Sequence, residues 1–161
     1  MRCGLYVHIP FCIKKCAYCD FASSSAPSTV HNLYFSALKK EIENYKGILL
    51  DSIFIGGGTP SCVDEHHIYD MLECIRRNMT LSEDIEITIE ANPGTLTHEK
   101  LCAYKACGIN RISIGAQSMQ DSELILLGRI HTLAQTIEAV EMIKSAGFTP
   151  FPVRCRRIIR S

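Results

Sequence analysis

Short apolar runs alternate along this chain with segments in which apolar residues recur every three or four positions. Runs of the first kind are typical of β-strands, and the longer recurrence is typical of amphipathic helices. The pattern predicts strands over 5–9, 52–55, 85–90 and 111–115. It predicts helices over about 30–46, 98–107 and 122–127, and a longer helix from Thr132 to Gly147. Another helix is predicted to begin after Asp64, with an apolar face made of Ile68, Met71, Leu72 and Ile75.

Capping residues define several of these helix boundaries. Asp64 and Thr97 stand where an N-cap is expected, because their side-chain oxygens can accept hydrogen bonds from backbone N–H groups of the first turn. Thr132, with Gln135 three positions later, predicts a capping box. Gly108 is expected to end the helix that starts after Thr97.

Four strand-then-helix units in succession predict an α/β fold with a parallel sheet and right-handed crossovers. The strands are apolar, so we expect them to be buried on both faces. A barrel and an open doubly wound sheet fit the pattern equally well. In both architectures ligands bind at the C-terminal ends of the strands, so the residues that follow the four strands are the candidates for a functional site.

Composition and charge exclude several classes of function. The 161 residues are 47% hydrophobic and 21% charged, and 17 basic residues balance 17 acidic ones. This balance gives no indication of a nucleic-acid or anionic-membrane partner, and no apolar run approaches the length of a membrane span. Nine cysteines, an odd number, without an apolar leader favour a reducing compartment over a disulfide framework, and we expect the protein to be cytoplasmic.

Three of the cysteines share one short loop directly after the first predicted strand. Cys12, Cys16 and Cys19 have the spacing Cys-x3-Cys-x2-Cys. Three thiolates at this spacing can hold three irons of a [4Fe–4S] cluster, and no fourth cysteine follows at ligand spacing, which leaves one iron for an exogenous ligand. A closed zinc site is the alternative, and its fourth ligand would be His8, Asp20 or Cys62.

Two further groups follow the second and third strands. The run Gly56-Gly57-Gly58-Thr59-Pro60 lacks the features of a phosphate loop or a dinucleotide site. It indicates either a close approach of bare backbone to a ligand or a tight turn with positive φ. Glu90 precedes the turn Asn92-Pro93-Gly94 and could accept hydrogen bonds from a ribose diol, although a lone carboxylate there could equally be a solvated rim residue.

Several segments of the chain together resemble one known family. They are Tyr6-Val7-His8-Ile9-Pro10-Phe11-Cys12, the cysteine triplet with Tyr18, the glycine run, Glu90-Ala91-Asn92-Pro93, Arg111-Ile112-Ser113-Ile114-Gly115-Ala116-Gln117-Ser118 and Leu127-Gly128-Arg129-Ile130-His131-Thr132. They are similar to the radical S-adenosylmethionine proteins related to oxygen-independent coproporphyrinogen III oxidase. The similarity runs from about residue 4 to about residue 148, and it implies a partial (β/α) barrel of about four βα units.

The resemblance also implies cofactors and site residues. In this family the open iron is chelated by the amino and carboxylate groups of S-adenosylmethionine, and an electron from the reduced cluster cleaves it to methionine and a deoxyadenosyl radical. The cluster ligands would be Cys12, Cys16 and Cys19. Tyr6, Gly57 and Glu90 match positions that contact this S-adenosylmethionine, and Tyr18 matches one against its nucleotide. Positions that contact a second S-adenosylmethionine in the oxidase are matched by Gly58, Thr59, Gln117 and Arg129.

Two of these residues have simpler interpretations when the resemblance is set aside. Arg129 could be a surface residue that opens a helix, and Gln117 could be a loop amide. None of the matched residues is predicted to be catalytic.

One departure from the oxidase pattern separates two branches of the family. The oxidase has a further cysteine two places after the triplet, where this chain has Phe21. The form Cys19-Asp20-Phe21 resembles the branch of haem chaperones, which keep the cluster and S-adenosylmethionine but deliver haem to partner proteins. The resemblance therefore implies a haem chaperone, with haem or a porphyrinogen, a haem-accepting protein and an electron donor as partners. The alternatives are the oxidase itself and a zinc-stabilised fragment without activity.

A second departure lies in residues 149–161. The segment contains two prolines and four arginines in its last eight residues, which is unsuited to a strand buried between helix layers. We therefore expect 1–148 to be the N-terminal part of the family's core domain and 149–161 to be an atypical tail, truncated or frame-shifted. A chain of four units would leave a sheet edge uncovered, so we expect it to be inactive alone.

Overall fold

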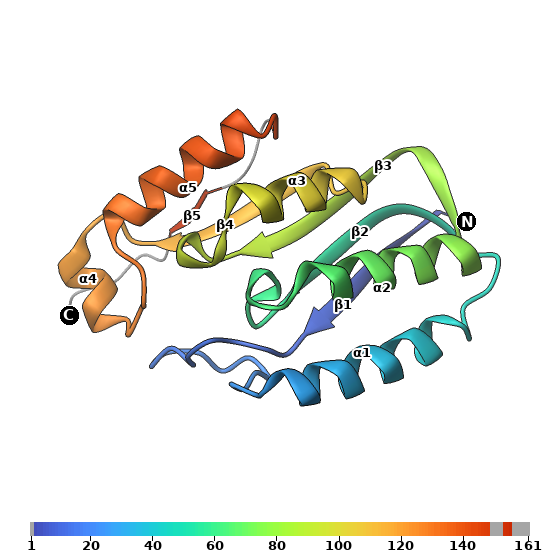
Figure 1. Ribbon diagram of the computed structural model, residues 1–161, viewed down its shortest axis with the longest axis horizontal. Helices are drawn as coiled ribbons and strands as arrows, with labels where there is room; N and C mark the ends of the chain where they lie inside the picture. The colour runs from blue at the N-terminus through green and yellow to red at the C-terminus, as the bar shows by residue number, and fades with distance from the viewer. Residues whose placement is uncertain (1, 149–152, 156–161) are drawn as a thin grey trace.

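The computed structural model describes residues 2–148 and 153–155, and within these ranges it contains one five-stranded parallel sheet covered by helices (Figure 1). The strands are β1 (Arg2–Ile9), β2 (Leu49–Gly57), β3 (Thr80–Ala91), β4 (Arg111–Gln117) and β5 (Val153–Cys155). The helices are α1 (Ser28–Ile42), α2 (Glu65–Asn78), α3 (His98–Ala106), α4 (Asp121–Leu126) and α5 (Leu133–Ser145), with 3-10 turns η1 (Pro60–Cys62) and η2 (Pro93–Thr95).

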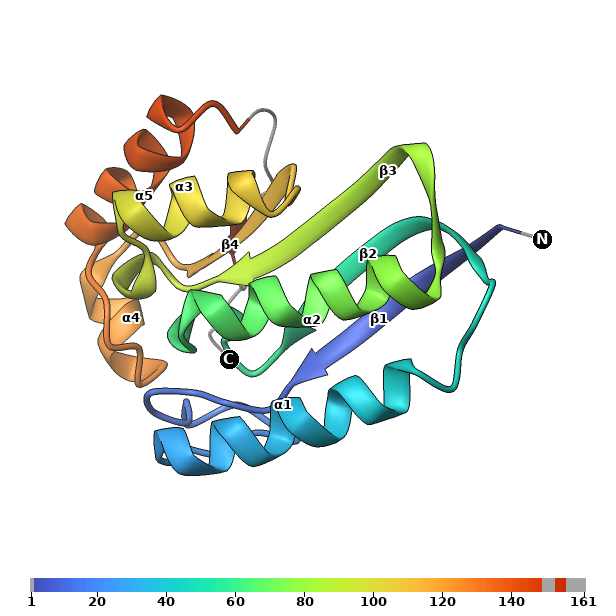
Figure 2. The ribbon, with the colours of Figure 1, turned by 45° about the vertical axis from the view of Figure 1, so that its right-hand side comes forward.

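The order of the strands decides between the two predicted architectures. The strands lie side by side in chain order, β1-β2-β3-β4-β5, and each pair is parallel. Helices α1, α2, α3 and α5 all cover the same side of the sheet in both views (Figures 1 and 2). A doubly wound sheet would reverse its strand order and carry helices on both faces. The fold is therefore a partial (β/α) barrel of four βα units, and β5 adds a short edge strand.

The hydrophobic core lies between the sheet and the helices. The predicted apolar face of α2 is confirmed, because Ile68, Met71, Leu72 and Ile75 are almost completely buried. The expected burial on both faces is found in the middle of β4, where Ile112, Ser113 and Ile114 are all almost completely buried. In β4 the side chains alternate, so that Ile112 and Ile114 face the helices while Ser113 lines a cavity on the other side of the sheet.

The predicted caps are confirmed. The Asp64 carboxylate accepts a hydrogen bond from the His66 backbone N–H, and the Thr97 hydroxyl accepts one from the Lys100 backbone N–H. Thr132 forms a complete capping box with Gln135. The boundary of the first helix differs from the prediction, because α1 ends at Ile42. The Asn44 and Tyr45 N–H groups continue in i to i−3 hydrogen bonds to the Glu41 and Ile42 carbonyls, and the Tyr45 side chain is 48% exposed.

The tail takes a form that the sequence analysis did not expect. Val153 pairs with Ile114 and Cys155 with Gln117, so a three-residue strand extends the sheet beyond β4. Val153 is 42% exposed, which agrees with an edge strand rather than a strand buried between helix layers. The predicted tail of residues 149–161 otherwise falls on 149–152 and 156–161, outside the described residues. None of the helices in the described ranges combines the length and hydrophobicity that a transmembrane helix needs.

Candidate functional site

A cavity of about 590 Å³ lies at the C-terminal ends of the strands. The arrowheads of β1 and β3 point toward the end of the molecule that carries α4 and the loop after β1 (Figure 1). The volume is within the usual range for small-molecule sites, roughly 300–1,000 Å³. All of the predicted site residues line this cavity, although they come from five separate segments of the chain: Tyr6, Cys12, Cys16, Tyr18, Cys19, Gly57, Gly58, Thr59, Glu90, Gln117 and Arg129.

The cysteine loop is anchored by its backbone. The Cys12 N–H donates to the Ser24 carbonyl at 3.0 Å, the Ser24 N–H donates to Pro10 O at 2.8 Å, and the Cys19 N–H donates to the Cys16 carbonyl at 3.1 Å. The three thiols are free and only partly buried. The loop therefore presents three thiols to the cavity from a backbone that folds back on β1.

Two of these sulfurs receive hydrogen bonds from other segments. The Thr59 hydroxyl donates to Cys12 Sγ at 3.7 Å, and the Arg129 guanidinium donates to Cys16 Sγ at 3.3 Å. Hydrogen bonds from an outer shell orient sulfur ligands and adjust the electronic properties of the metal that they bind.

A single zinc ion does not fit the arrangement. In the described part of the chain, no three His, Cys, Asp or Glu side chains converge on a position for one metal ion. The ring nitrogens of His8, a candidate fourth ligand, lie 3.1 Å from the Tyr6 hydroxyl and 2.9 Å from the Ala22 carbonyl. Thiolates around a [4Fe–4S] cube each bind a different iron and need not converge on one point, so the donor set fits a cluster better than zinc.

The glycine run packs against the cysteine loop. Gly57 has φ of 116°, which confirms the interpretation of a turn with positive φ. A Cβ atom on Gly58 would lie 2.6 Å from the Phe11 carbonyl oxygen and 2.9 Å from Cys12 Sγ. The backbone at Gly58 thus approaches the cysteine loop closely, whereas the close approach to a ligand stays a prediction.

Glu90 and Tyr6 face the same part of the cavity. Burial raises the pKa of Tyr6, and the negative charge of Glu90 raises it further. Both residues line the cavity wall, and the Tyr6 ring stacks on Phe54, with ring centroids 6.1 Å apart. Glu90 is thus part of the cavity wall rather than an isolated residue of the rim.

Gln117 adopts a strained backbone conformation at the end of β4. Its φ is 66°, and it is the central residue of a turn in which the Ser118 N–H donates to the Ala116 carbonyl at 2.8 Å. Such a turn is uncommon for a residue other than glycine, and strain of this kind, about 1–3 kcal/mol, concentrates at functional sites. The turn places the Gln117 side chain at the cavity.

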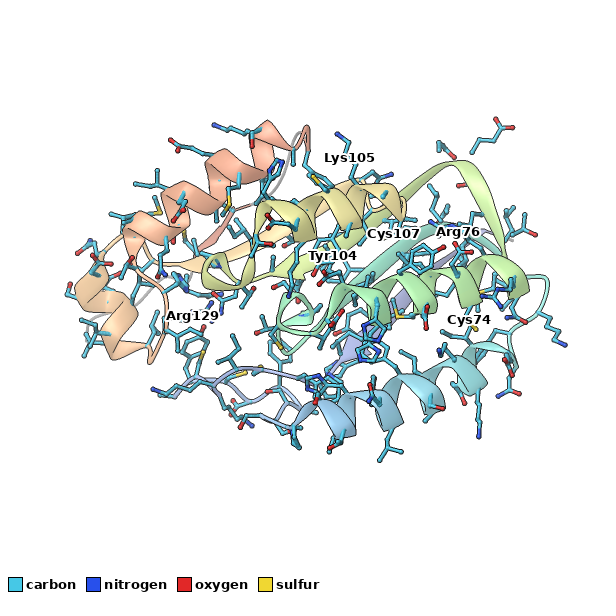
Figure 3. The ribbon with its side chains drawn as sticks, in the orientation of Figure 1. Cys74, Arg76, Tyr104, Lys105, Cys107 and Arg129 are labelled. Carbon is cyan, nitrogen blue, oxygen red and sulfur yellow. The ribbon has the colours of Figure 1, made fainter. Side chains whose placement is uncertain are left out.

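Arg129 is not the surface residue that one interpretation of the sequence allowed. Its Nη2 donates to Asn92 Oδ1 at 2.7 Å and to the Gly115 carbonyl at 3.0 Å. In Figure 3 it lies between α4 and the loop that follows β1. The guanidinium therefore connects the ends of β3 and β4 with the cysteine loop.

A buried network beneath the site was not predicted. The Ser61 hydroxyl accepts from the Asn92 N–H at 3.1 Å and is hydrogen-bonded to the Thr95 hydroxyl, which in turn donates to the Asn92 carbonyl at 2.7 Å. These bonds tie η1, after the glycine run, to η2, after Glu90. Serine and threonine are common in turns, so no sequence signal distinguished them.

Two lining residues on the strands were also missed as site residues. Ser113 on β4 and Cys155 on β5 reach the cavity because of their register in the sheet. Two buried polar atoms at the cavity, Ser113 Oγ and Arg129 Nε, lack a hydrogen-bond partner among the described residues. Native proteins leave few such atoms unsatisfied, and these two fit a cavity that receives a polar ligand.

Comparisons with known proteins agree with this geometry. The chain is 40% identical over 157 residues to "Heme chaperone HemW" of Haemophilus influenzae, and this match covers 92% of the chain and 41% of the relative. It is 37% identical to the mitochondrial "Radical S-adenosyl methionine domain-containing protein 1" of Mus musculus, covering 86% of the chain and 32% of that relative. The chain thus spans about two fifths or less of these curated relatives.

A solved structure has the same fold as this chain. Coproporphyrinogen III oxidase (HemN) of Escherichia coli, described as a radical SAM enzyme, superposes with a TM-score of 0.85 at 28% identity, over 93% of this chain and 36% of that one. The model of the Radical SAM superfamily matches residues 6–159, which is almost the whole chain. With the three cysteines, the glycine run and the barrel-type sheet in place, this chain belongs to the radical SAM superfamily.

Proposed function

We propose that this chain is part of a protein that binds a [4Fe–4S] cluster and S-adenosylmethionine, with residues 1–148 as the N-terminal part of its core domain. The observation that carries the proposal is the cavity into which three cysteine thiols, a glycine turn, Glu90 and Arg129 are brought from separate strand ends. Cys12, Cys16 and Cys19 would hold the cluster. When bound, the reduced cluster supplies the electron that cleaves S-adenosylmethionine.

The cavity residues divide into two proposed groups. Tyr6, Tyr18, Gly57 and Glu90 would contact the S-adenosylmethionine that is bound to the cluster, with the Glu90 carboxylate as hydrogen-bond acceptor. Gly58, Thr59, Gln117 and Arg129 would border the neighbouring part of the cavity. Their common support is that all of them line one cavity beside the three thiols.

This proposal predicts a coloured, ligand-binding protein. Anaerobic reconstitution with iron and sulfide should give a brown protein with about four irons and four sulfides per chain. The reconstituted protein should bind S-adenosylmethionine in equilibrium dialysis, whereas the metal-free protein should bind it much more weakly. A colourless protein that takes up one zinc per chain would contradict the proposal.

We further propose that the whole protein is a haem chaperone, with haem as its ligand, a haem-accepting protein as its partner and an electron donor for the cluster. Its support is the 40% identity to relatives named heme chaperones and the presence of Phe21, which is 64% exposed and lines the cavity. A phenyl ring cannot take the place of a thiol. The nine free cysteines agree with a reducing compartment, which we propose to be the cytoplasm.

The alternative function is oxygen-independent coproporphyrinogen III oxidation, which the structural similarity to HemN favours. The two functions make different predictions for the whole protein after reconstitution. A haem chaperone should show a haem absorbance band that saturates on titration and should release no carbon dioxide from coproporphyrinogen in the presence of S-adenosylmethionine and dithionite. Release of carbon dioxide at a rate above that of the metal-free protein would favour the oxidase instead.

A further inference from the structure

The Arg129 guanidinium joins three parts of the site. Nη1 donates to Cys16 Sγ at 3.3 Å, from a position 113 residues later in the chain. Nη2 donates to Asn92 Oδ1 and to the Gly115 carbonyl. Because these two oxygens hold the planar group from one side, Nη1 is directed at the sulfur rather than free to rotate away from it.

The charge of Arg129 has no carboxylate partner in the described ranges, since the ion pairs found there involve other residues. Two of its acceptors are neutral oxygens. The third, Cys16 Sγ, carries negative charge once the thiol is deprotonated to bind a metal. The guanidinium is also only partly exposed, so its charge is less screened by water than that of a surface arginine.

A hydrogen bond to a cluster sulfur, together with a nearby positive charge, stabilises the more negative, reduced form of an iron–sulfur cluster. We propose that Arg129 is a positioning residue that raises the reduction potential of the cluster through its N–H···S bond to Cys16. This role differs from the contact with a second S-adenosylmethionine that the resemblance implies. The inference rests on the proposed cluster and concerns the reduction potential of that cluster.

The test is a redox titration of the anaerobically reconstituted protein, followed by electron paramagnetic resonance. In R129M the equilibrium constant for one-electron reduction should fall about tenfold, which lowers the midpoint potential by about 59 mV. R129K keeps the charge but loses the planar fork, so its potential should lie between those of R129M and the wild type. The matched control is K14M, because Lys14 is the other lysine or arginine among the described residues that line the cavity.

The comparison among the variants decides the inference. A shift in R129M that is clearly larger than the shift in K14M supports it. Equal shifts would mean that only a distant charge acts, and no shift would mean that the bond has no electronic effect; either result overturns the inference. If R129M assembles no cluster, the same comparison is made between R129K and K14M. A wild-type protein without a cluster would overturn the proposed function as well, whereas an unchanged potential in R129M overturns this inference alone.

Discussion

Replacement of Cys16 by alanine is expected to lower the iron and sulfide content of the reconstituted protein at least about tenfold relative to the wild type. A [4Fe–4S] cluster with one open iron needs three thiolate ligands, and the loop has no spare thiol, because Cys12 and Cys19 would be the two other ligands. The measurement is the iron and sulfide content per chain after anaerobic reconstitution and gel filtration, together with the charge-transfer absorbance of the cluster.

The matched control for this variant is Cys62→Ala. Cys62 follows the same glycine run and was a candidate zinc ligand, but burial, together with the charge of Cys12, raises the pKa of its thiol to about 11. A thiol with this pKa stays protonated at neutral pH and is a poor metal ligand. Cys62→Ala should therefore keep the full iron content. Loss of iron in Cys62→Ala to the same extent as in Cys16→Ala would show that the ligand set is wrong.

Gly58→Ala is expected to have the second large effect, because the added methyl group meets backbone rather than a flexible side chain. Its Cβ would lie 2.6 Å from the Phe11 carbonyl oxygen. Both backbone segments of this contact are held in place, since the Gly58 N–H donates to Ile9 O at 2.8 Å and the Thr59 N–H donates to the same Phe11 oxygen at 2.7 Å. Overpacking of this kind costs about 1–3 kcal/mol of stability.

The displacement in Gly58→Ala would also move Cys12, whose sulfur would lie 2.9 Å from the new methyl group. We expect the affinity for iron to fall about 10–100-fold, the size of effect known for changes next to metal ligands. Urea unfolding of the metal-free protein measures the first effect, and iron retention against a chelator measures the second.

Gly94→Ala is the control for the same chemical change. At Gly94 the nearest atom to an added Cβ is His131 Cβ at 3.7 Å, an ordinary van der Waals contact. This variant should retain both stability and iron. If Gly58→Ala behaved like Gly94→Ala, the packing of the glycine run against the cysteine loop would have no functional importance.

Local features of the structure were predictable from the sequence because their causes lie within a few residues. The apolar spacing of Ile68, Met71, Leu72 and Ile75 and the capping groups of Asp64 and Thr132 act over one or two helical turns, and all of them are found as expected. The end of the first helix was placed too late because the apolar spacing continues beyond Ile42 to Tyr45, but the Tyr45 side chain is half exposed and its hydroxyl donates to the Glu41 carboxylate.

The site was predictable to the extent that its residues follow strands. Parallel strands bring their C-terminal ends to one edge, so Cys12, Gly57, Glu90 and Gln117 could be assigned to one rim before their distances were known. Residues that reach the cavity from the middle of a strand, such as Ser113, carry no comparable signal. Their exposure to the cavity depends on which face of the strand turns toward the helices.

The amino-acid order alone established the sequence of strands and helices, their caps, the cysteine loop and the rim on which it lies, because these depend on neighbouring residues and on the direction of parallel strands. The hydrophobic pattern did not choose between a barrel and an open sheet; the family resemblance implied the barrel, and the strand order of the folded chain confirms it. Only the folded chain decided the bond from Arg129 to Cys16, the strained turn at Gln117 and the network around Ser61. Contacts of this kind join residues far apart in the chain, and they arise only when packing brings separate strand ends together.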